Sequence, residues 1–148
     1  MTSGTSEERG SRDGAAELTS LVRRIMPFCD VLGLTVVSAS PDRVEANVEW
    51  TVERTTVFGG LHGGYVMAVA DSTGALCAAQ NLADGEGTST IESKTNFLRP
   101  IMEGVATIVS TPVHVGRTTI VVQTEVLRAD GKRAAITTQT QAVHPAGA

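Results

Sequence analysis

Aromatic residues are scarce in this chain of 148 residues, in which phenylalanine, tryptophan and tyrosine together make up 3%. The aliphatic residues valine, alanine, isoleucine and leucine must therefore build the core, which an apolar fraction of 41% allows. No apolar run reaches the roughly 18–20 residues that cross a bilayer, so we expect no membrane association. The N-terminus shows no basic start followed by an apolar segment, so we expect no secretion signal.

Cysteines and basic residues are also few. Cys29 and Cys77 are the only cysteines, and neither they nor the histidines have the spacing of metal ligands. We expect no metal site, and Cys77 is interpreted as a small core residue. Sixteen acidic against twelve basic residues give a net charge of −4, which argues against general nucleic-acid binding. The length suits a single domain, and the composition favours a cytoplasmic location.

The N-terminal region divides into two parts. Residues 1–14 are rich in serine, threonine, glycine and glutamate, which is the composition of a disordered tail. Residues 15–26 carry leucine, valine and isoleucine at helical spacing, and Pro27 follows. We therefore predict a short amphipathic helix at the edge of a single domain that spans residues 15–145.

The rest of the chain predicts an α+β fold. Alternating apolar and polar residues from Val44 to Trp50 indicate a strand, and an earlier strand is expected over residues 32–39. An apolar helix is expected over residues 63–79, and the pair Asp130-Gly131 predicts a hairpin. Four later runs rich in valine, isoleucine and threonine are predicted as strands at residues 88–97, 105–113, 118–128 and 132–143. This order predicts an antiparallel sheet of five to six strands.

The most informative segment is the predicted helix over residues 63–79, where Asp71 is the only charged residue. A helix that is apolar on all sides is usually buried, and a lone carboxylate there is costly unless it is paired, protonated or used. Gly63 and Gly64 leave the first N–H groups of the helix open at its positive end. Open donors and one acid are the groups that an acyl-transfer or hydrolysis site needs.

A simpler interpretation of this segment remains open. Residues 64–70 could form a strand, with Asp71, Ser72 and Thr73 capping a shorter helix. Gly74 favours this alternative, because a glycine inside a helix costs about 1 kcal/mol relative to alanine.

The segment His62-Gly63-Gly64, followed after six residues by Asp71, resembles the signature of hotdog-fold acyl-CoA thioesterases of the phenylacetate-pathway and 4-hydroxybenzoyl-CoA type. Further motifs follow in the same order and at similar spacing, at residues 96–100, 104, 113–119 and 130–132. The resemblance implies a long central helix wrapped by a curved antiparallel sheet. It also implies an enzyme that hydrolyses acyl-CoA to a free acid and coenzyme A, without a metal or redox cofactor.

The resemblance also suggests roles for individual residues. Asp71 corresponds to the general base or nucleophile, and the N–H of Gly63 corresponds to the oxyanion donor beside Gly64. His62 is expected to shape the loop. Thr56 stands where relatives often carry asparagine or glutamine, and Thr90 lies near a position where relatives place a hydroxyl that orients the water.

Coenzyme A is expected to bind on the outer rim of the domain. The candidates that the resemblance supplies are Arg99, Arg117, Thr118 and Arg133. Each arginine is explained equally well as a solvated strand end.

The spacing of the candidate catalytic groups predicts a shared site. Asp71 lies eight residues after Gly63, about 12 Å along a helix, whereas one thioester carbon must lie ~3 Å from both groups. We therefore expect the site to combine two subunits, as the resemblance also implies, in a homodimer or a homotetramer. The alternatives are a non-catalytic acyl-CoA-binding hotdog module, which Thr56 favours, and a hotdog dehydratase, whose histidine motif the chain lacks.

Overall fold

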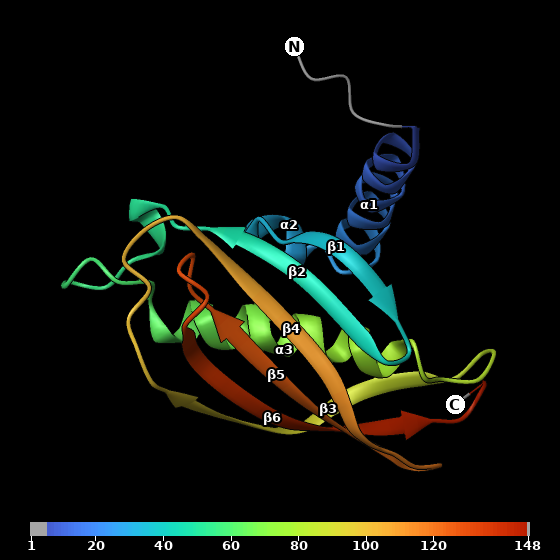
Figure 1. The fold of residues 1–148 in the computed structure, drawn as a ribbon. Helices are drawn as coiled ribbons and strands as arrows, with labels where there is room; N and C mark the ends of the chain where they lie inside the picture. Colours follow the sequence, from blue (N-terminus) through green and yellow to red (C-terminus); the bar gives the residue numbers. More distant parts are fainter. Residues whose placement is uncertain (1–5, 148) are drawn as a thin grey trace.

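One long helix, α3 (Gly63–Ala79), lies along the concave side of a curved sheet in the computed structural model (Figure 1). The structure describes residues 6–147, with side chains from residue 14. Over these residues the sheet has six antiparallel strands in the order β1-β2-β4-β5-β6-β3. The predicted α+β hotdog arrangement is therefore confirmed, and the interpretation of residues 64–70 as a strand is wrong.

The hairpin before α3 and the four strands after it match the predicted pattern. The strands are β1 (Thr35–Ser40), β2 (Arg43–Glu49), β3 (Gly87–Phe97), β4 (Val105–Val115), β5 (Thr119–Leu127) and β6 (Arg133–His144). The expected start of the first strand at residue 32 is wrong, because a short helix, α2 (Phe28–Leu32), precedes β1. Gly33 ends α2 in the left-handed region at φ 67°, where glycine is favoured, and the chain then enters β1.

Helix α1 (Ser6–Ile25) packs at the edge of the domain against β1, as expected for an amphipathic helix there. The Thr19 hydroxyl donates to the carbonyl of Val36 at 3.2 Å and accepts from the Val36 N–H at 2.9 Å. The helix begins at Ser6, although its composition predicts a tail up to residue 14. The predicted start of the helix at residue 15 thus lies inside α1, and residues 1–5 of the predicted tail lie outside the described residues. Among the residues described, no helix is long and apolar enough to span a membrane.

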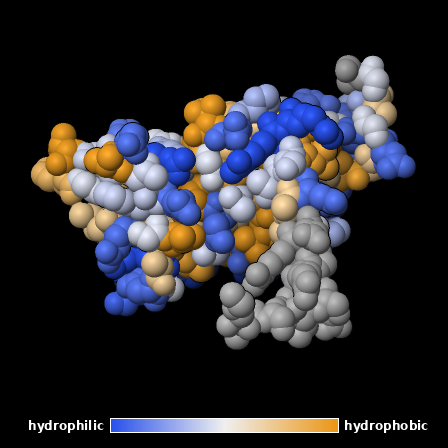
Figure 2. All heavy atoms as spheres, turned by 90° about the horizontal axis from the view of Figure 1, so that it is seen from above, coloured by the Kyte–Doolittle hydropathy of each residue, from blue (hydrophilic) through white to orange (hydrophobic). Residues whose placement is uncertain are grey.

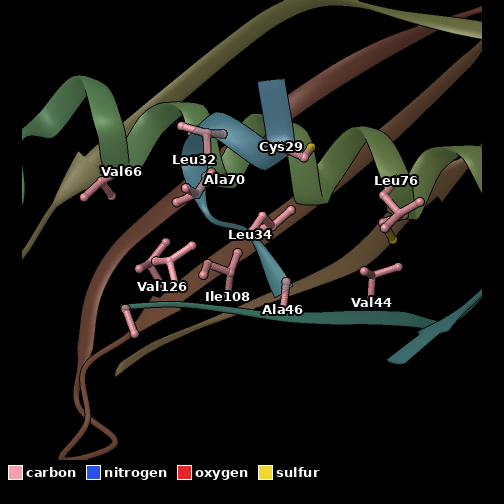
Figure 3. Packing of buried hydrophobic residues seen from close by; sticks show 14 of the residues in the cluster. Cys29, Leu32, Leu34, Val44, Ala46, Val66, Ala70, Leu76, Ile108 and Val126 are labelled. Carbon is pink, nitrogen blue, oxygen red and sulfur yellow. The ribbon is translucent and has the colours of Figure 1, made fainter. Parts of the chain in front are cut away.

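The core lies between α3 and the concave face of the sheet (Figure 3). Val69 and Ala70 of α3 are fully buried and belong to the same cluster as Ile108, Val122 and Val126 of the sheet. The aliphatic composition predicted for this core is confirmed. Because the residues of α3 are small, the helix can sit close to the sheet, and its polar side chains must find partners there.

Strand β3 forms one edge of the sheet and pairs only with β6. Its register places Phe97 opposite Ala135 near the start of α3, and Thr90 opposite Gln141 further along the helix. A bulge interrupts the pairing at Ile91, whose side chain is 61% exposed. An eleven-residue edge strand offers unpaired backbone groups to a second chain.

Both cysteines are buried, and we expect their thiols to be unreactive in the folded protein. Burial raises the pKa of Cys77 from its ordinary 9.0 to about 11, which leaves roughly 100-fold less thiolate at neutral pH. Burial also raises the pKa of Cys29, against the opposing effects of Ser72 and Arg23. Ellman's reagent at pH 7.5 should therefore label both thiols slowly in buffer and rapidly in guanidinium chloride. Rapid labelling of the native protein would contradict the burial.

Candidate active site

The first turn of α3 leaves the Gly63 N–H open. His62 caps the helix with extended backbone angles (φ −61°, ψ 134°), and its Nδ1 accepts a hydrogen bond from the Gly64 N–H at 3.0 Å. The Gly64 amide is thus engaged within the loop. Among the described residues the Gly63 N–H has no protein acceptor, so it is open to bind an oxygen at the positive end of the helix.

Glycine at position 63 lets the ring of Phe97 lie close to the start of α3. A Cβ atom there would lie 3.3 Å from the ring of Phe97, which is closer than ordinary contact. The segments that meet at this point are the start of α3 and the end of β3. Gly63 and Phe97 thus lie side by side, and both line a cavity at the start of the helix.

The carboxylate of Asp71 is half-buried and faces β3 and β6, not the solvent side of α3. Its Oδ1 accepts hydrogen bonds from the Thr90 hydroxyl at 3.0 Å and from Nε2 of Gln139 at 3.3 Å. Oδ2 accepts no hydrogen bond from the side chains that the structure describes. One oxygen of the acid is therefore held in place and the other is available to a ligand or water.

The group around Asp71 continues through buried amides. Nε2 of Gln141 donates to the Thr90 hydroxyl at 2.8 Å, and the Thr88 hydroxyl donates to Oε1 of Gln141 at 3.1 Å. Gln139 and Gln141 have no exposed surface. The sequence analysis did not single out these glutamines. The available signal was their alternation with Thr137 on the face of β6 that should be apolar.

The structure brings Asp71 and Thr90 together but leaves Thr56 elsewhere. Thr56 lies in the loop after the short helix η1 (Val52–Arg54), where its hydroxyl accepts from the Phe58 N–H at 3.3 Å. This loop also presents Val57 and Phe58 to solvent, at 93% and 86% exposure. The left end of the molecule, where this loop lies in Figure 1, carries apolar surface in Figure 2.

Two cavities flank the start of α3. One of about 380 Å³ is lined by Gly63, Val66 and Phe97 among others. A second of about 920 Å³ is lined by Phe28, Val31, Arg54 and Tyr65 among others, and also by His62 and Gly64. Both walls are mostly apolar, and both reach the glycine pair, so the helix terminus lies where an apolar group could be held.

Polar contacts define the wall of the larger cavity. The guanidinium of Arg54 lies over the Tyr65 ring, 5.2 Å from its centroid, and donates to the carbonyl of Glu49 at 2.9 Å. The Tyr65 hydroxyl donates to the carbonyl of Leu32 at 2.6 Å. Burial raises the pKa of Tyr65, so this hydroxyl keeps its proton at neutral pH.

The four residues expected at a coenzyme A rim fall at opposite ends of the sheet. The Arg99 N–H donates to the carbonyl of Ala134, whereas the carbonyl of Thr118 accepts from the Val143 N–H. Ala134 and Val143 are nine residues apart on β6, about 30 Å along a strand. Arg99 and Arg133 thus lie at one end, and Arg117 and Thr118 at the other.

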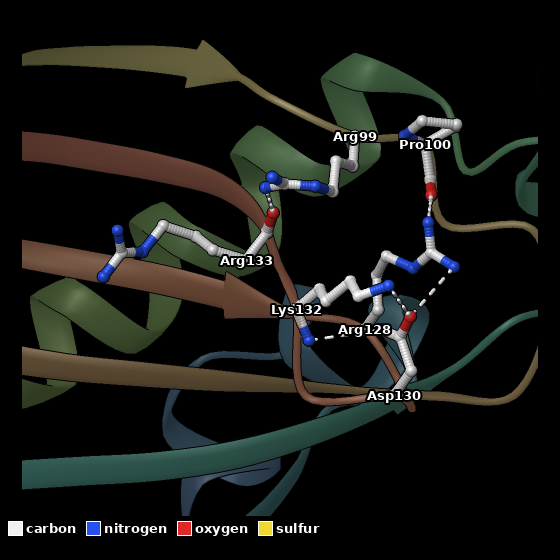
Figure 4. A network of polar contacts seen from close by, with 6 residues as sticks. All are labelled: Arg99, Pro100, Arg128, Asp130, Lys132 and Arg133. Atoms are coloured by element: carbon white, nitrogen blue, oxygen red, sulfur yellow. Dashed lines mark hydrogen bonds and ion pairs between the residues drawn. The ribbon is translucent and has the colours of Figure 1, made fainter.

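The Arg99 end carries further cations that the sequence analysis did not include (Figure 4). Arg128 and Lys132 both approach Asp130, at 3.3 and 3.7 Å. The Lys132 backbone N–H, together with these cations, holds the pKa of Asp130 below its usual range. The Arg133 guanidinium contacts Glu125, and Arg99 contacts only the Arg133 carbonyl among the residues drawn in Figure 4. Arg99 is therefore the cation of this group with no acidic partner in the described chain.

Comparison with known proteins assigns the family. The family model of the thioesterase superfamily matches residues 58–135. The chain belongs to this superfamily. A protein of Saccharolobus solfataricus, for which an esterase activity is proposed, is 36% identical over 116 residues, or 78% of this chain and 80% of that protein. A solved thioesterase from Haemophilus influenzae is 28% identical, covers 78% of this chain and 80% of its own, and superposes with a TM-score of 0.74.

The name of a third relative states its substrate. The 1,4-dihydroxy-2-naphthoyl-CoA hydrolase of Listeria monocytogenes is 26% identical over 94 residues, which cover 64% of this chain and 76% of that enzyme. Together these relatives support thioester hydrolysis as the general activity of the chain. They confirm the hotdog thioesterase resemblance that the His62-Gly63-Gly64 motif and Asp71 indicate.

The described residues contain no group of three or more His, Cys, Asp or Glu side chains placed to hold a metal ion. His114 lies on β4 and is exposed, and His144 contacts the Ser89 hydroxyl at 2.7 Å at the end of β6. Neither histidine reaches Asp71.

We predict that His62 stabilises α3 by capping it. The substitution His62→Ala removes the acceptor for the Gly64 N–H and should lower the free energy of unfolding by about 1 kcal/mol. His62→Asn keeps a capping oxygen and should retain most of that stability. Urea denaturation measures both variants. Equal midpoints for the two would show that the cap contributes nothing.

Proposed function

We propose that this protein hydrolyses acyl-CoA thioesters to a free acid and coenzyme A. Asp71 activates the attacking water or attacks the thioester itself, and the Gly63 N–H binds the oxyanion. The observation that carries the proposal is that α3 presents two polar groups without partners. Hydrogen bonds hold Oδ1 of Asp71, whereas Oδ2 accepts none from the described side chains. The Gly64 N–H is bonded to His62, whereas the Gly63 N–H has no acceptor among the described residues.

The chemistry follows from these two groups. In the general-base route, Asp71 removes a proton from water as the water oxygen bonds to the thioester carbon. The carbonyl oxygen becomes an oxyanion, which the Gly63 N–H and the positive end of α3 stabilise. When the carbon–sulfur bond breaks, the proton held by Asp71 passes to the thiolate. In the nucleophile route, an oxygen of Asp71 bonds to the thioester carbon and the coenzyme A thiolate leaves, which gives a mixed anhydride. Water then hydrolyses this anhydride to the free acid and the Asp71 carboxylate.

The position of Thr90 refines its proposed role. Its hydroxyl proton is engaged by Asp71, and it accepts a hydrogen bond from Gln141. Thr90 thus orients the carboxylate directly and any water through it. Thr56 is the residue whose part in orienting water is least supported, because its hydroxyl bonds to its own loop.

We propose that each site is shared by two copies of the chain. Gly63 and Asp71 of one helix are separated by about 12 Å, and the edge strand β3 passes beside both. Antiparallel pairing of two β3 strands about a two-fold axis would set the Phe97 end of one copy beside the Thr90 part of the other. In such a dimer the second copy would also bury part of the exposed apolar loop around Phe58. A dimer, or a tetramer built from it, is therefore the proposed assembly.

The same pairing supports coenzyme A as the thiol carrier. One copy's Arg99 end would meet the second copy's Arg117 and Thr118, so cations from both ends of the sheet could contact one nucleotide. Arg133 is a weaker candidate, because its guanidinium already contacts Glu125. The action of the Listeria relative on an acyl-CoA agrees with this proposal.

The test of the activity is a panel of aromatic, short-chain and medium-chain acyl-CoAs assayed with a thiol reagent. Asp71→Asn keeps the shape of the side chain without its charge and should lower kcat/KM by roughly 10³-fold or more. Circular dichroism serves as the folding control. After a single turnover in H₂¹⁸O, label in the Asp71 peptide would establish the nucleophile route with water attack at the Asp71 carbonyl, because the general-base route leaves the carboxylate unlabelled. An unchanged rate in Asp71→Asn would end the proposal.

The shared site is tested by mixing two inactive variants. Gly63→Pro removes the N–H at the first helical position, where proline is tolerated, and His62 already has the backbone that a following proline requires. The new Cβ requires a small shift of the exposed Phe97 ring. If the groups act across the interface, refolding Asp71→Asn together with Gly63→Pro should restore about a quarter of wild-type activity, because half the dimers are mixed and each has one intact site. No restoration, or a stable active monomer by light scattering, would contradict the shared site.

A non-catalytic acyl-CoA-binding module is the second candidate. The engagement of the Thr56 hydroxyl with the Phe58 N–H is the observation that favours it, since relatives use this position at the reaction centre. Saturable binding of acyl-CoA without release of thiol across the panel would support this alternative.

A further inference from the structure

The side-chain amide of Gln139 is buried at the contact between α3 and β6. Among the described residues it donates hydrogen bonds to Asp71 alone. Nε2 donates to the backbone carbonyl of Asp71 at 3.2 Å and to its Oδ1 at 3.3 Å. The side chain has no exposed surface. The Nε2 atom of Gln139 therefore faces two oxygens of Asp71.

The other end of this amide is unpaired. Oε1 of Gln139 is buried without a hydrogen-bond partner in the described structure. Rotating the amide by 180° would not help, because Oε1 would then face the two oxygens of Asp71. A buried acceptor without a donor costs free energy, so an apolar side chain would suit stability better at this position.

Gly74 makes room for the amide. A Cβ atom on residue 74 would lie 2.2 Å from Oε1 and 2.6 Å from Cδ of Gln139, which no pair of atoms tolerates. Glycine is among the poorest residues for the interior of a helix. The helix that carries Asp71 thus contains an unfavourable residue at the one place where the Gln139 side chain needs space.

We propose that Gln139 is a positioning residue that holds the Asp71 carboxylate in its reactive orientation, and that position 74 is glycine to admit it. The inference rests on the proposed function of Asp71. The Gln139 amide and the Thr90 hydroxyl both donate hydrogen bonds to Oδ1, so Oδ2 is the oxygen that faces the substrate. Gln141 contributes to the same positioning, because its Nε2 donates a hydrogen bond to the Thr90 hydroxyl. Two features that lower stability thereby serve one geometric purpose.

The first test replaces Gln139 by methionine, which keeps the length of the side chain and removes both donors. We expect kcat to fall roughly 10- to 100-fold, as when a partner that orients an active-site group is lost, while KM stays unchanged. The urea midpoint should change little, because removal of the unpaired Oε1 offsets the loss of the two hydrogen bonds to Asp71. A kcat equal to that of the wild type would overturn the inference.

Thr137→Val is the matched control for this variant. Thr137 lies two residues before Gln139 on the same buried face of β6, but its hydroxyl bonds to Thr95 at 2.7 Å and not to Asp71. Loss of this buried hydrogen bond should lower stability and leave kcat unaltered. If Thr137→Val lowered kcat as much as Gln139→Met does, the effect would belong to packing of β6 in general, and the inference would fail.

A second variant approaches the same contact from α3. Gly74→Ala should lower both kcat and the urea midpoint, because the new methyl group displaces the amide. In a Gln139→Ala background the same change should raise the midpoint, since alanine favours the helix once the space is empty. The same sign of effect in both backgrounds, or full kcat in Gly74→Ala alone, would overturn the inference.

The outcome for Asp71→Asn separates the two proposals. If that variant keeps wild-type activity, the proposed function fails and the role of Gln139 fails with it. If Asp71→Asn is inactive while Gln139→Met and Gly74→Ala retain full kcat, only the positioning role is wrong.

Discussion

The structure depends on how one carboxylate is accommodated in an otherwise apolar contact between a helix and a sheet. Asp71 is the only charged residue of α3, and its Oδ1 is held by Thr90 and Gln139. Burial of such a group is costly unless hydrogen bonds replace water. The strands β3 and β6 supply those bonds, so the mostly aliphatic face of the sheet that packs on the helix carries polar side chains where it meets Asp71.

This constraint shapes the residues around it. The amide of Gln139 needs space that only Gly74 allows, and the hydroxyl of Thr90 is fixed by Gln141. At the N-terminus of the helix, His62 accepts a hydrogen bond from the N–H of Gly64, and the N–H of Gly63 stays open. The helix thus carries a held acid along its length and an open amide at its start, which are the two halves of the proposed hydrolytic site. It cannot bring them together within one copy.

The succession of elements was predictable from the sequence because the hydrophobic periodicity and turn residues mark them clearly. The hairpin before α3 appears where alternation indicates it, and the strands β3 to β6 appear at the runs rich in valine, isoleucine and threonine that turn residues separate. The helix α2 was not predicted, because its five residues are too few to show a period, and Gly33 rather than a pattern ends it. The candidate acid and the glycine pair were identified through the motif, whereas Gln139 and Gln141 were not.

The sequence by itself determined the fold class, the aliphatic core, the helix with its lone acid and the glycine entry, because each is written in residues close together along the chain. Tertiary structure alone decided which oxygen of Asp71 is held and which amide of the glycine pair is open. It also decided that the candidate arginines lie about 30 Å apart at two ends of the sheet. Those facts depend on the register between β3 and β6 and on the packing of α3 against them, which join residues up to 68 positions apart.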